Sequence, residues 1–148
     1  MREILFRGKR TSYPYEGWAE GSLLCVDGHC MILEKENDDN GYCYPYINAE
    51  DGIVDGGLTT VDPETMGQYT GLKDKNGRRI FEGDIVKVKH SYAGNPNYPT
   101  AEYIEVVEYD ARSCCYEFYR WSGDIYDVEV IGNIHDNPEM LKGENTNG

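Results

Sequence analysis

Two cysteines and a histidine near the start of the chain could form part of a metal site. Cys25, His29 and Cys30 fall within six residues, and Cys43 follows. Zinc needs four ligands and usually takes them from Cys-x-x-Cys pairs, which this cluster lacks. A two-residue turn at Asp27-Gly28 would also place Cys25 opposite Cys30 and His29 on the other face of the strands. We therefore expect no metal and no cofactor. Reduced, packed thiols are the favoured state, and a Cys25–Cys30 disulfide is the alternative.

Nucleophilic catalysis needs a nucleophile, a base and an orienting group close together. The three histidines, His29, His90 and His135, are far apart in the sequence, and none lies in a nucleophile elbow, a phosphate-binding glycine loop or a His-Glu-x-x-His motif. With 27 Asp and Glu residues, accidental carboxylate pairs are unavoidable and indicate nothing. The sequence predicts no catalytic residues, so we expect a protein that is not an enzyme.

A group of basic residues in the middle of the chain could contact nucleic acid. Its members are Lys73, Lys75, Arg78, Arg79, Lys87 and Lys89. The formal net charge of the chain is −13, however, and such a charge repels a phosphate backbone. Nucleic-acid binding is therefore not the leading expectation. The alternative function that we retain is a nucleic-acid-associated protein, or an acidic DNA mimic that acts on a DNA-binding protein.

Aromatic residues offer the better candidates for partner binding. Tyr92 and Tyr98 lie in a loop, residues 91–101, that is rich in Gly, Asn and Pro. Loops of this length are often functional, and tyrosines in such loops supply contact area at a low cost in entropy. Trp18, in the N-terminal part, is the third candidate. We expect a protein partner, and a second copy of the chain is among the options.

Strands and turns must position these residues. The 13 Tyr and 17 Gly residues, together with abundant Ile and Val, indicate a mostly β protein. Apolar residues on either side of Asp27-Gly28 predict a hairpin. Further strands are expected at 78–81, 85–90, 103–109, 115–121 and 126–134, of which 103–109 and 115–121 should form a hairpin. Short helical turns are expected after Asp62 and Asn137, each of which is followed by proline.

These elements suggest a division into parts. Residues 1–68 should form a β-rich N-terminal part with acidic loops, and residues 69–142 an SH3-like barrel. Residues 143–148 should be a disordered tail. The sequence has no apolar run long enough to span a membrane and no export signal at its start, so we expect a cytoplasmic protein without membrane contact.

Three stretches of the sequence resemble the YopX family of phage and prophage proteins. The first is the run Asp62 to Gly77, followed by Ile80-Phe81-Glu82-Gly83-Asp84-Ile85-Val86. The second is Arg2 to Lys9 with Gly17-Trp18, and the third is Ile131 to Glu139. The resemblance implies a phage protein with a C-terminal SH3-type barrel, and it brings no assigned activity and no catalytic residues. We therefore expect a non-enzymatic phage or prophage accessory protein that acts as a protein-binding or assembly module.

Overall fold

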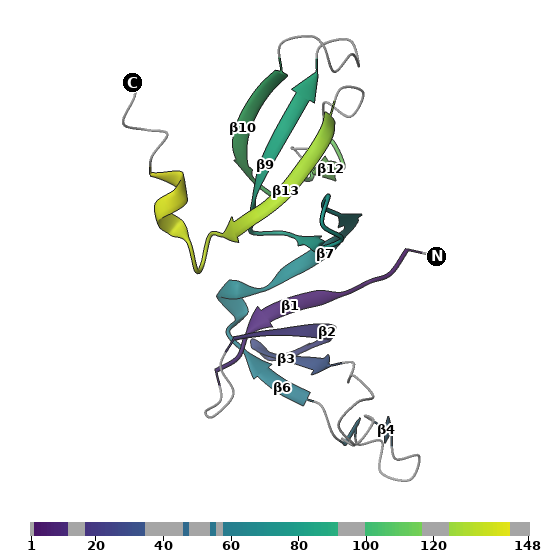
Figure 1. The fold of residues 1–148 in the computed structure, drawn as a ribbon. Coiled ribbons are helices and arrows are strands. Elements are labelled where there is room, and N and C mark those ends of the chain that lie inside the picture. Colours follow the sequence, from purple (N-terminus) through teal and green to yellow (C-terminus); the bar gives the residue numbers. More distant parts are fainter. Residues whose placement is uncertain are drawn as a thin grey trace. The chain divides into compact units, whose positions relative to one another are not determined.

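A computed structural model of the chain shows a fold of strands and short 3-10 helices (Figure 1). It describes residues 2–11, 17–34, 46–47, 54–55, 58–91, 100–116 and 125–142. No α-helix occurs among these residues, and the predicted mostly β class is confirmed. The contacts within the chain define a first unit, Met1–Tyr69, and a second unit, Thr70–Gly148.

The first unit is built on an antiparallel sheet. Its strands lie in the order β6-β3-β2-β1-β7. They are β1 (Phe6–Lys9), β2 (Trp18–Val26), β3 (His29–Glu34), β6 (Leu58–Val61) and the first residues of β7 (Gly67–Lys73). A separate pair joins β4 (Tyr46–Ile47) to β5 (Val54–Asp55).

The hairpin of β2 and β3 has the predicted two-residue turn. Asp27 and Gly28 have φ angles of 51° and 81°, the left-handed values that a type I′ turn requires at both central positions. Glycine adopts this conformation without strain, and aspartate is one of the few other residues that tolerates it. The turn fixes the register, in which Cys25 lies opposite Cys30 and Val26 opposite His29.

The sheet of the first unit is strongly curled. Beyond the end of β1, Arg10 forms a β-bridge with Val61 of β6, and the Thr11 amide donates to the Thr60 carbonyl over 3.2 Å. Ala19, Cys30, Ile32 and Val61 form the buried core on the inner side of the curl. Gly8 allows this approach, because a Cβ atom at that position would lie 2.9 Å from the Cβ of Val61.

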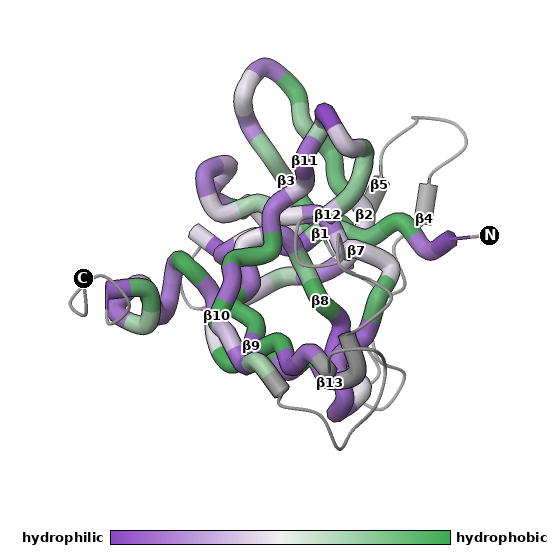
Figure 2. Tube along the Cα trace, turned by 90° about the horizontal axis from the view of Figure 1, so that it is seen from above, coloured by the Kyte–Doolittle hydropathy of each residue, from purple (hydrophilic) through white to green (hydrophobic). Residues whose placement is uncertain are grey.

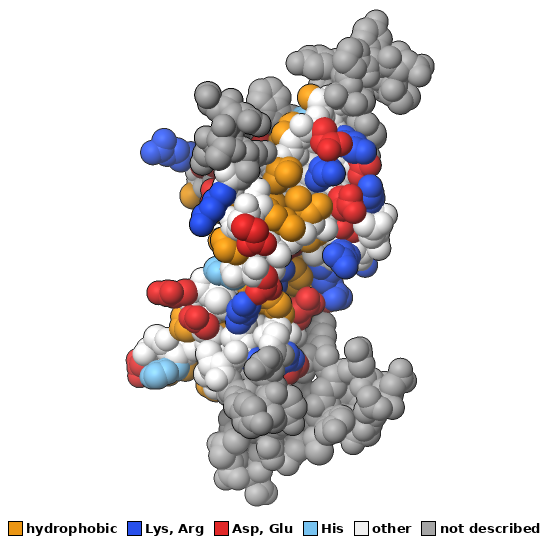
Figure 3. All heavy atoms as spheres, turned by 60° about the vertical axis from the view of Figure 1, so that its left-hand side comes forward, with side chains coloured by type: hydrophobic (Ala, Val, Ile, Leu, Met, Phe, Trp, Pro, Cys, Tyr) orange, Lys and Arg blue, Asp and Glu red, His pale blue; other side chains and the backbone are white. Residues whose placement is uncertain are grey.

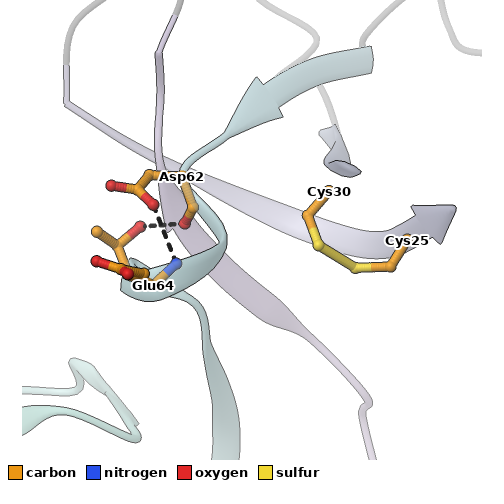
Figure 4. The surroundings of a disulfide bond; sticks show 5 residues. Cys25, Cys30, Asp62 and Glu64 are labelled. Carbon is orange, nitrogen blue, oxygen red and sulfur yellow. Dashed lines mark hydrogen bonds between the residues drawn. A yellow bond between two sulfur atoms is a disulfide. The ribbon is translucent and has the colours of Figure 1, made fainter. Parts of the chain in front are cut away.

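The helical turn predicted after Asp62 links β6 to β7. The 3-10 helix η2 (Pro63–Thr65) begins after Asp62, whose carboxylate accepts a hydrogen bond of 3.0 Å from the Glu64 amide (Figure 4). Proline at the first helical position lacks an N–H that would in any case have no partner within the helix. The Thr65 hydroxyl donates to the Asp62 carbonyl and accepts from the Lys9 amide, so the turn is fixed to the end of β1.

The second unit contains a three-stranded antiparallel sheet in the order β10-β9-β13. Within this unit lie the last residues of β7, β8 (Arg79–Phe81), β9 (Asp84–Ser91), β10 (Thr100–Val106), β11 (Tyr109–Asp110), β12 (Cys115–Tyr116), β13 (Ile125–Asn133) and the 3-10 helix η5 (Pro138–Leu141). Hydrophobic and hydrophilic residues alternate along β9 and β10, as Figure 2 shows. Ile80, Val86, Val88 and Val107 form the core, and Val128 and Val130 pack against it.

Asp74 ties the β7–β8 turn to β13. One carboxylate oxygen accepts from the amides of Asn76 and Arg78, at 2.8 and 2.9 Å, and the other accepts from the amide of Val130 at 3.0 Å. Burial raises the pKa of this carboxyl, but the hydrogen bonds from these three backbone amides and the charge of Arg78 outweigh burial, so its pKa lies below the ordinary value.

Three predictions about the second unit are not confirmed in full. Of the expected hairpin of 103–109 with 115–121, the described residues show only the pairing of β11 with β12, because β10 pairs along its whole length with β9 instead, and residues 117–121 lie outside the described residues. The SH3-like barrel is not confirmed, since no sheet among the described residues closes into a barrel. The alternation of residues 126–134 predicts that Ile134 faces the same core as Val128 and Val130. The bulge between Val130 and Gly132 shifts this alternation, and Ile134 is not among the side chains that pack against that core. The predicted tail, residues 143–148, lies outside the described residues.

Candidate protein-binding face

Trp18 lies on the outer face of the first unit's sheet, opposite Lys9 in the β1–β2 register. The Arg7 guanidinium carbon is 4.6 Å from the centre of the indole ring, and Lys9 Nζ is 5.8 Å from it. Both cations are within the range of a cation–π interaction, which strengthens as the groups lose water. Trp18 is half-buried, and Arg7 is buried beside it. This predicted site residue is therefore held in a fixed orientation by two basic neighbours.

A row of exposed apolar side chains continues across the same face. Leu24 is 44% exposed, Val26 54% and Leu58 37%. Leu24 of β2 lies opposite Met31 of β3, and Leu33 of β3 lies opposite Leu58 of β6. We call this set, Leu24, Val26, Met31, Leu33 and Leu58, the apolar row. Contiguous exposed apolar side chains are rare on monomeric proteins and usually mark an interaction site.

Sequence reasoning missed the apolar row, although one signal pointed to it. In the strand before the turn, Leu23 and Cys25 alternate with Leu24 and Val26, so both faces are apolar. A strand at the surface of a small sheet normally has one polar face. A hairpin that is apolar on both faces therefore either lies inside the protein or presents one face to a partner.

Cys25 and Cys30 form a disulfide across the hairpin, as Figure 4 shows. Their Cα atoms are 4.3 Å apart, the close spacing of a cross-strand pair that does not exchange backbone hydrogen bonds. The favoured expectation of reduced thiols at these positions is wrong, because the register that the turn imposes brings the two sulfur atoms together. The bond lies opposite the apolar row and stiffens the strands that present it.

Removing the disulfide should destabilise the hairpin. For a loop this short the chain-entropy model gives roughly 2 kcal/mol. We expect the Cys25→Ser/Cys30→Ser double variant, at pH 7, to melt several degrees below wild type and to lose amide protection at the β2–β3 turn. Hydrogen exchange followed by mass spectrometry measures this. Cys114→Ser, which changes an exposed free cysteine, is the matched control. Equal protection in the three proteins would contradict the prediction.

Three of the six residues of the predicted basic group lie beside carboxylates. Lys87 and Lys89 lie 3.3 and 3.7 Å from the carboxylate oxygens of Glu102, and Lys75 lies 3.2 Å from Glu129 and 3.7 Å from Asp127. The hydrogen bond with Glu129, and then the charge of Asp127, raise the pKa of Lys75.

Lysines and carboxylates thus alternate on one side of the second unit. Figure 3 shows Lys and Arg side chains interleaved with Asp and Glu side chains, beside a group of hydrophobic ones. The remaining members of the basic group, Lys73, Arg78 and Arg79, have exposed side chains. Binding to a nucleic-acid duplex requires a continuous positive surface. Lys75, Lys87 and Lys89 do not provide one, because each forms an ion pair with Glu102, Asp127 or Glu129.

Other tyrosines of the second unit lie in aromatic contacts. Tyr92 and Tyr98, the predicted loop anchors, lie outside the described residues. Tyr103 stacks on His90, with ring centres 4.9 Å apart, and its hydroxyl contacts the imidazole Nε2. Burial, followed by the charge of Glu105, raises the pKa of Tyr103. Tyr109 meets Tyr116 edge to face at 5.4 Å. Tyr103 and Tyr116 pack against the core of the second unit, whereas Tyr109 is exposed.

The structure also gives the positions of the histidines that were considered as metal ligands or catalytic residues. Within the described ranges, no three His, Cys, Asp or Glu side chains gather in a way that could hold a metal ion. His29 flanks the hairpin turn, His90 stacks on Tyr103, and His135 follows β13. Each of the three histidines therefore belongs to a different part of the fold: β3, β9 and the segment after β13. Cys43 is not among the described residues.

The fold and the surface together define a β-rich protein of two compact units. Three of the five large hydrophobic side chains that are exposed among the described residues lie on one sheet. The model of the family described as YopX protein matches residues 23–142. The chain therefore belongs to the YopX family, and the resemblance seen in the sequence is confirmed.

A solved structure supports the same fold. The chain is similar to the crystal structure of protein EF1440 from Enterococcus faecalis, with 25% sequence identity and a TM-score of 0.51. The match covers 95% of this chain and 99% of that one. The comparison with curated proteins gives no match. No helix among the described residues is long and apolar enough to cross a membrane.

Proposed function

We propose that the chain is a non-enzymatic accessory protein of phage or prophage origin that works in the cytoplasm of the bacterial host as a protein-binding or assembly module. The observation that supports this function is the apolar row on the outer face of β2, β3 and β6. Three of its side chains are more than a third exposed, and a stable monomer gains nothing from leaving them in water.

The composition of the face fits protein recognition. Aromatic residues, Met and Arg are enriched at the centres of protein interfaces, whereas Lys, Glu and Asp are depleted there. The outer face carries Trp18 and Arg7 at one end, and Met31 and the leucines of the apolar row at the other. On the paired part of β1 and β2, the other charged residues of this face are Glu20 and Lys9. Trp18 is an apt anchor because its ring is already oriented by Arg7, so little entropy is lost on binding.

The phage or prophage setting comes from the family resemblance, and the absence of an activity from the lack of a catalytic motif in the sequence. A nucleic-acid role has less support, since Lys75, Lys87 and Lys89 already contact carboxylates. The function therefore rests on the first unit rather than on the basic group.

Substitution of the apolar row tests the function. We expect a Val26→Ser/Leu58→Ser variant to melt within a few degrees of wild type, because both side chains are largely in solvent, and to lose the proteins that wild type retains from bacterial lysate by at least about tenfold. Quantitative mass spectrometry of captured proteins measures this. Ile4→Ser is the matched control, since Ile4 is 64% exposed but precedes the sheet.

One outcome of this capture experiment would contradict the proposed function. If wild type, the row variant and the Ile4→Ser control retain the same proteins in the same amounts, the apolar row is not a binding face and the proposed function loses its support.

A further inference from the structure

Among the described residues, about half of strand β2 has an open edge. On one side β2 pairs with β3 from Gly21 to Val26. On the other side it pairs with β1 only from Trp18 to Gly21. No described strand lies beside residues 22–26 on that second side, and no backbone hydrogen bond between described residues reaches them there.

The backbone of this edge is oriented for pairing. In a two-residue hairpin the pair next to the turn, Val26 and His29, exchanges hydrogen bonds, and bonded and non-bonded pairs then alternate along the strands. Leu23 and Cys25 belong to non-bonded pairs, so their N–H and C=O groups point away from β3, toward the open edge. The Asp27-Gly28 turn fixes the register of the hairpin and so holds these groups in an extended conformation before any partner arrives.

Natural proteins usually protect such edges with charges, proline or a covering segment. The edge of β6 is covered by Arg10 and Thr11, and β10 carries Glu102 and Glu105. Residues 22–26, Ser-Leu-Leu-Cys-Val, contain no charge and no proline, and Leu24 and Val26 are about half exposed. A short, apolar, unprotected edge is the signature of a strand that pairs with another chain.

We propose that the open edge of β2 pairs in antiparallel fashion with the same edge of a second copy of this chain. The inference rests on the proposed function, and it names a second copy of the chain as the partner that contacts Leu24 and Val26 of the apolar row. The edge is complementary to itself. With full overlap of residues 22–26, Leu24 faces the partner's Leu24 and Leu23 faces the partner's Cys25, so no like charges are opposed. Leu23 and Cys25 each exchange backbone hydrogen bonds across the interface.

This pairing joins the two apolar rows. Ser22, Leu24 and Val26 share one face of β2, so Val26 of each copy lies beside the partner's Ser22, and Leu24 is shielded by the partner's Leu24. Two copies with a net charge of −13 each repel one another, and dissolved salt screens this repulsion. Dimerisation should therefore strengthen as salt is raised, which is the opposite of what a basic partner would show.

Charge substitution at the centre of the interface tests the inference. Sedimentation velocity of the wild-type chain, from micromolar to millimolar concentration, should show a monomer–dimer equilibrium that shifts toward dimer with added salt. Leu24→Lys and Leu24→Glu should each weaken the dimer by about tenfold or more, because like charges would face each other. An equal mixture of the two variants should restore a dimer. Thr60→Lys, an exposed position of the same face on β6, is the matched control and should dimerise like wild type.

The outcomes separate this inference from the proposed function. A wild-type chain that stays monomeric at every concentration and salt, or a mixture that fails to associate more than its single variants, overturns pairing through Leu24. If the monomeric chain nevertheless retains proteins that Val26→Ser/Leu58→Ser loses, the apolar row binds a different protein and the proposed function stands. Far-UV circular dichroism of each variant verifies that a loss of dimer is not a loss of fold.

Discussion

An Asp74→Ala variant is expected to melt well below the wild-type protein. The substitution leaves the amides of Asn76, Arg78 and Val130 without the carboxylate that now accepts from all three at 2.8 to 3.0 Å. Hydrogen bonds to a charged group contribute about 1.5 to 3 kcal/mol each and are not additive, so a loss on the order of 3 kcal/mol is expected. Urea unfolding at pH 7 measures it. Asp127→Ala, which removes a carboxylate that forms a surface ion pair with Lys75, should cost less than about 1 kcal/mol.

Asp74 also predicts how stability depends on pH. Its pKa lies below the ordinary value of 3.8, so its ionised form is favoured by folding. The stabilisation is therefore complete above the pKa of the unfolded chain and is lost as the pH falls through the lower pKa of the folded state. The difference in unfolding free energy between wild type and Asp74→Asn should be largest at neutral pH and shrink in acid. A difference that stays constant down to strong acid would contradict this account.

The second large effect is expected at Ile32, in the core of the first unit. Ile32 is fully buried against Ala19, Cys30 and Val61, and truncation of such a side chain to alanine costs about 2 to 5 kcal/mol. We expect Ile32→Ala to lower the protection of amides in β2 and β3 against hydrogen exchange. Val88→Ala, in the core of the second unit, should lower protection in β9 and β13 instead.

These two variants also test the predicted division of the chain after residue 68. If each substitution weakens only its own unit, the units unfold separately. If both variants lower protection to the same extent throughout the chain, it unfolds as one cooperative unit and the predicted domains are wrong.

Local patterns in the sequence predicted local structure well. The Asp-Gly pair predicted the hairpin, and the Asx-Pro pairs predicted the positions of both 3-10 helices. Each of these patterns depends only on residues that are close neighbours in the sequence. The two helical turns begin differently, since the Asp62 side chain caps η2, whereas the Asn137 side chain accepts from the Asn133 amide and does not cap η5.

Features that depend on distant residues were not predicted. The choice of β9 as the partner of β10, the stacking of Arg7 on Trp18 and the neutralisation of Lys75 all arise from strand order and register. The disulfide was considered but not favoured, because the reasoning relied on the expected compartment rather than on the register that the turn imposes. The candidate site was found only at Trp18, since one sequence cannot tell which face of an apolar hairpin is outside.

The pairing of β1 has a consequence for the order of folding during synthesis. Phe6 pairs with Gln68, and Arg10 bridges to Val61, so strands near the start of the chain find their partners more than fifty residues later. The β2–β3 hairpin needs only its own two-residue loop and can form as soon as it leaves the ribosome. The first unit can close only after β6 and the start of β7 have emerged, and until then the hairpin presents its apolar strands to the surroundings.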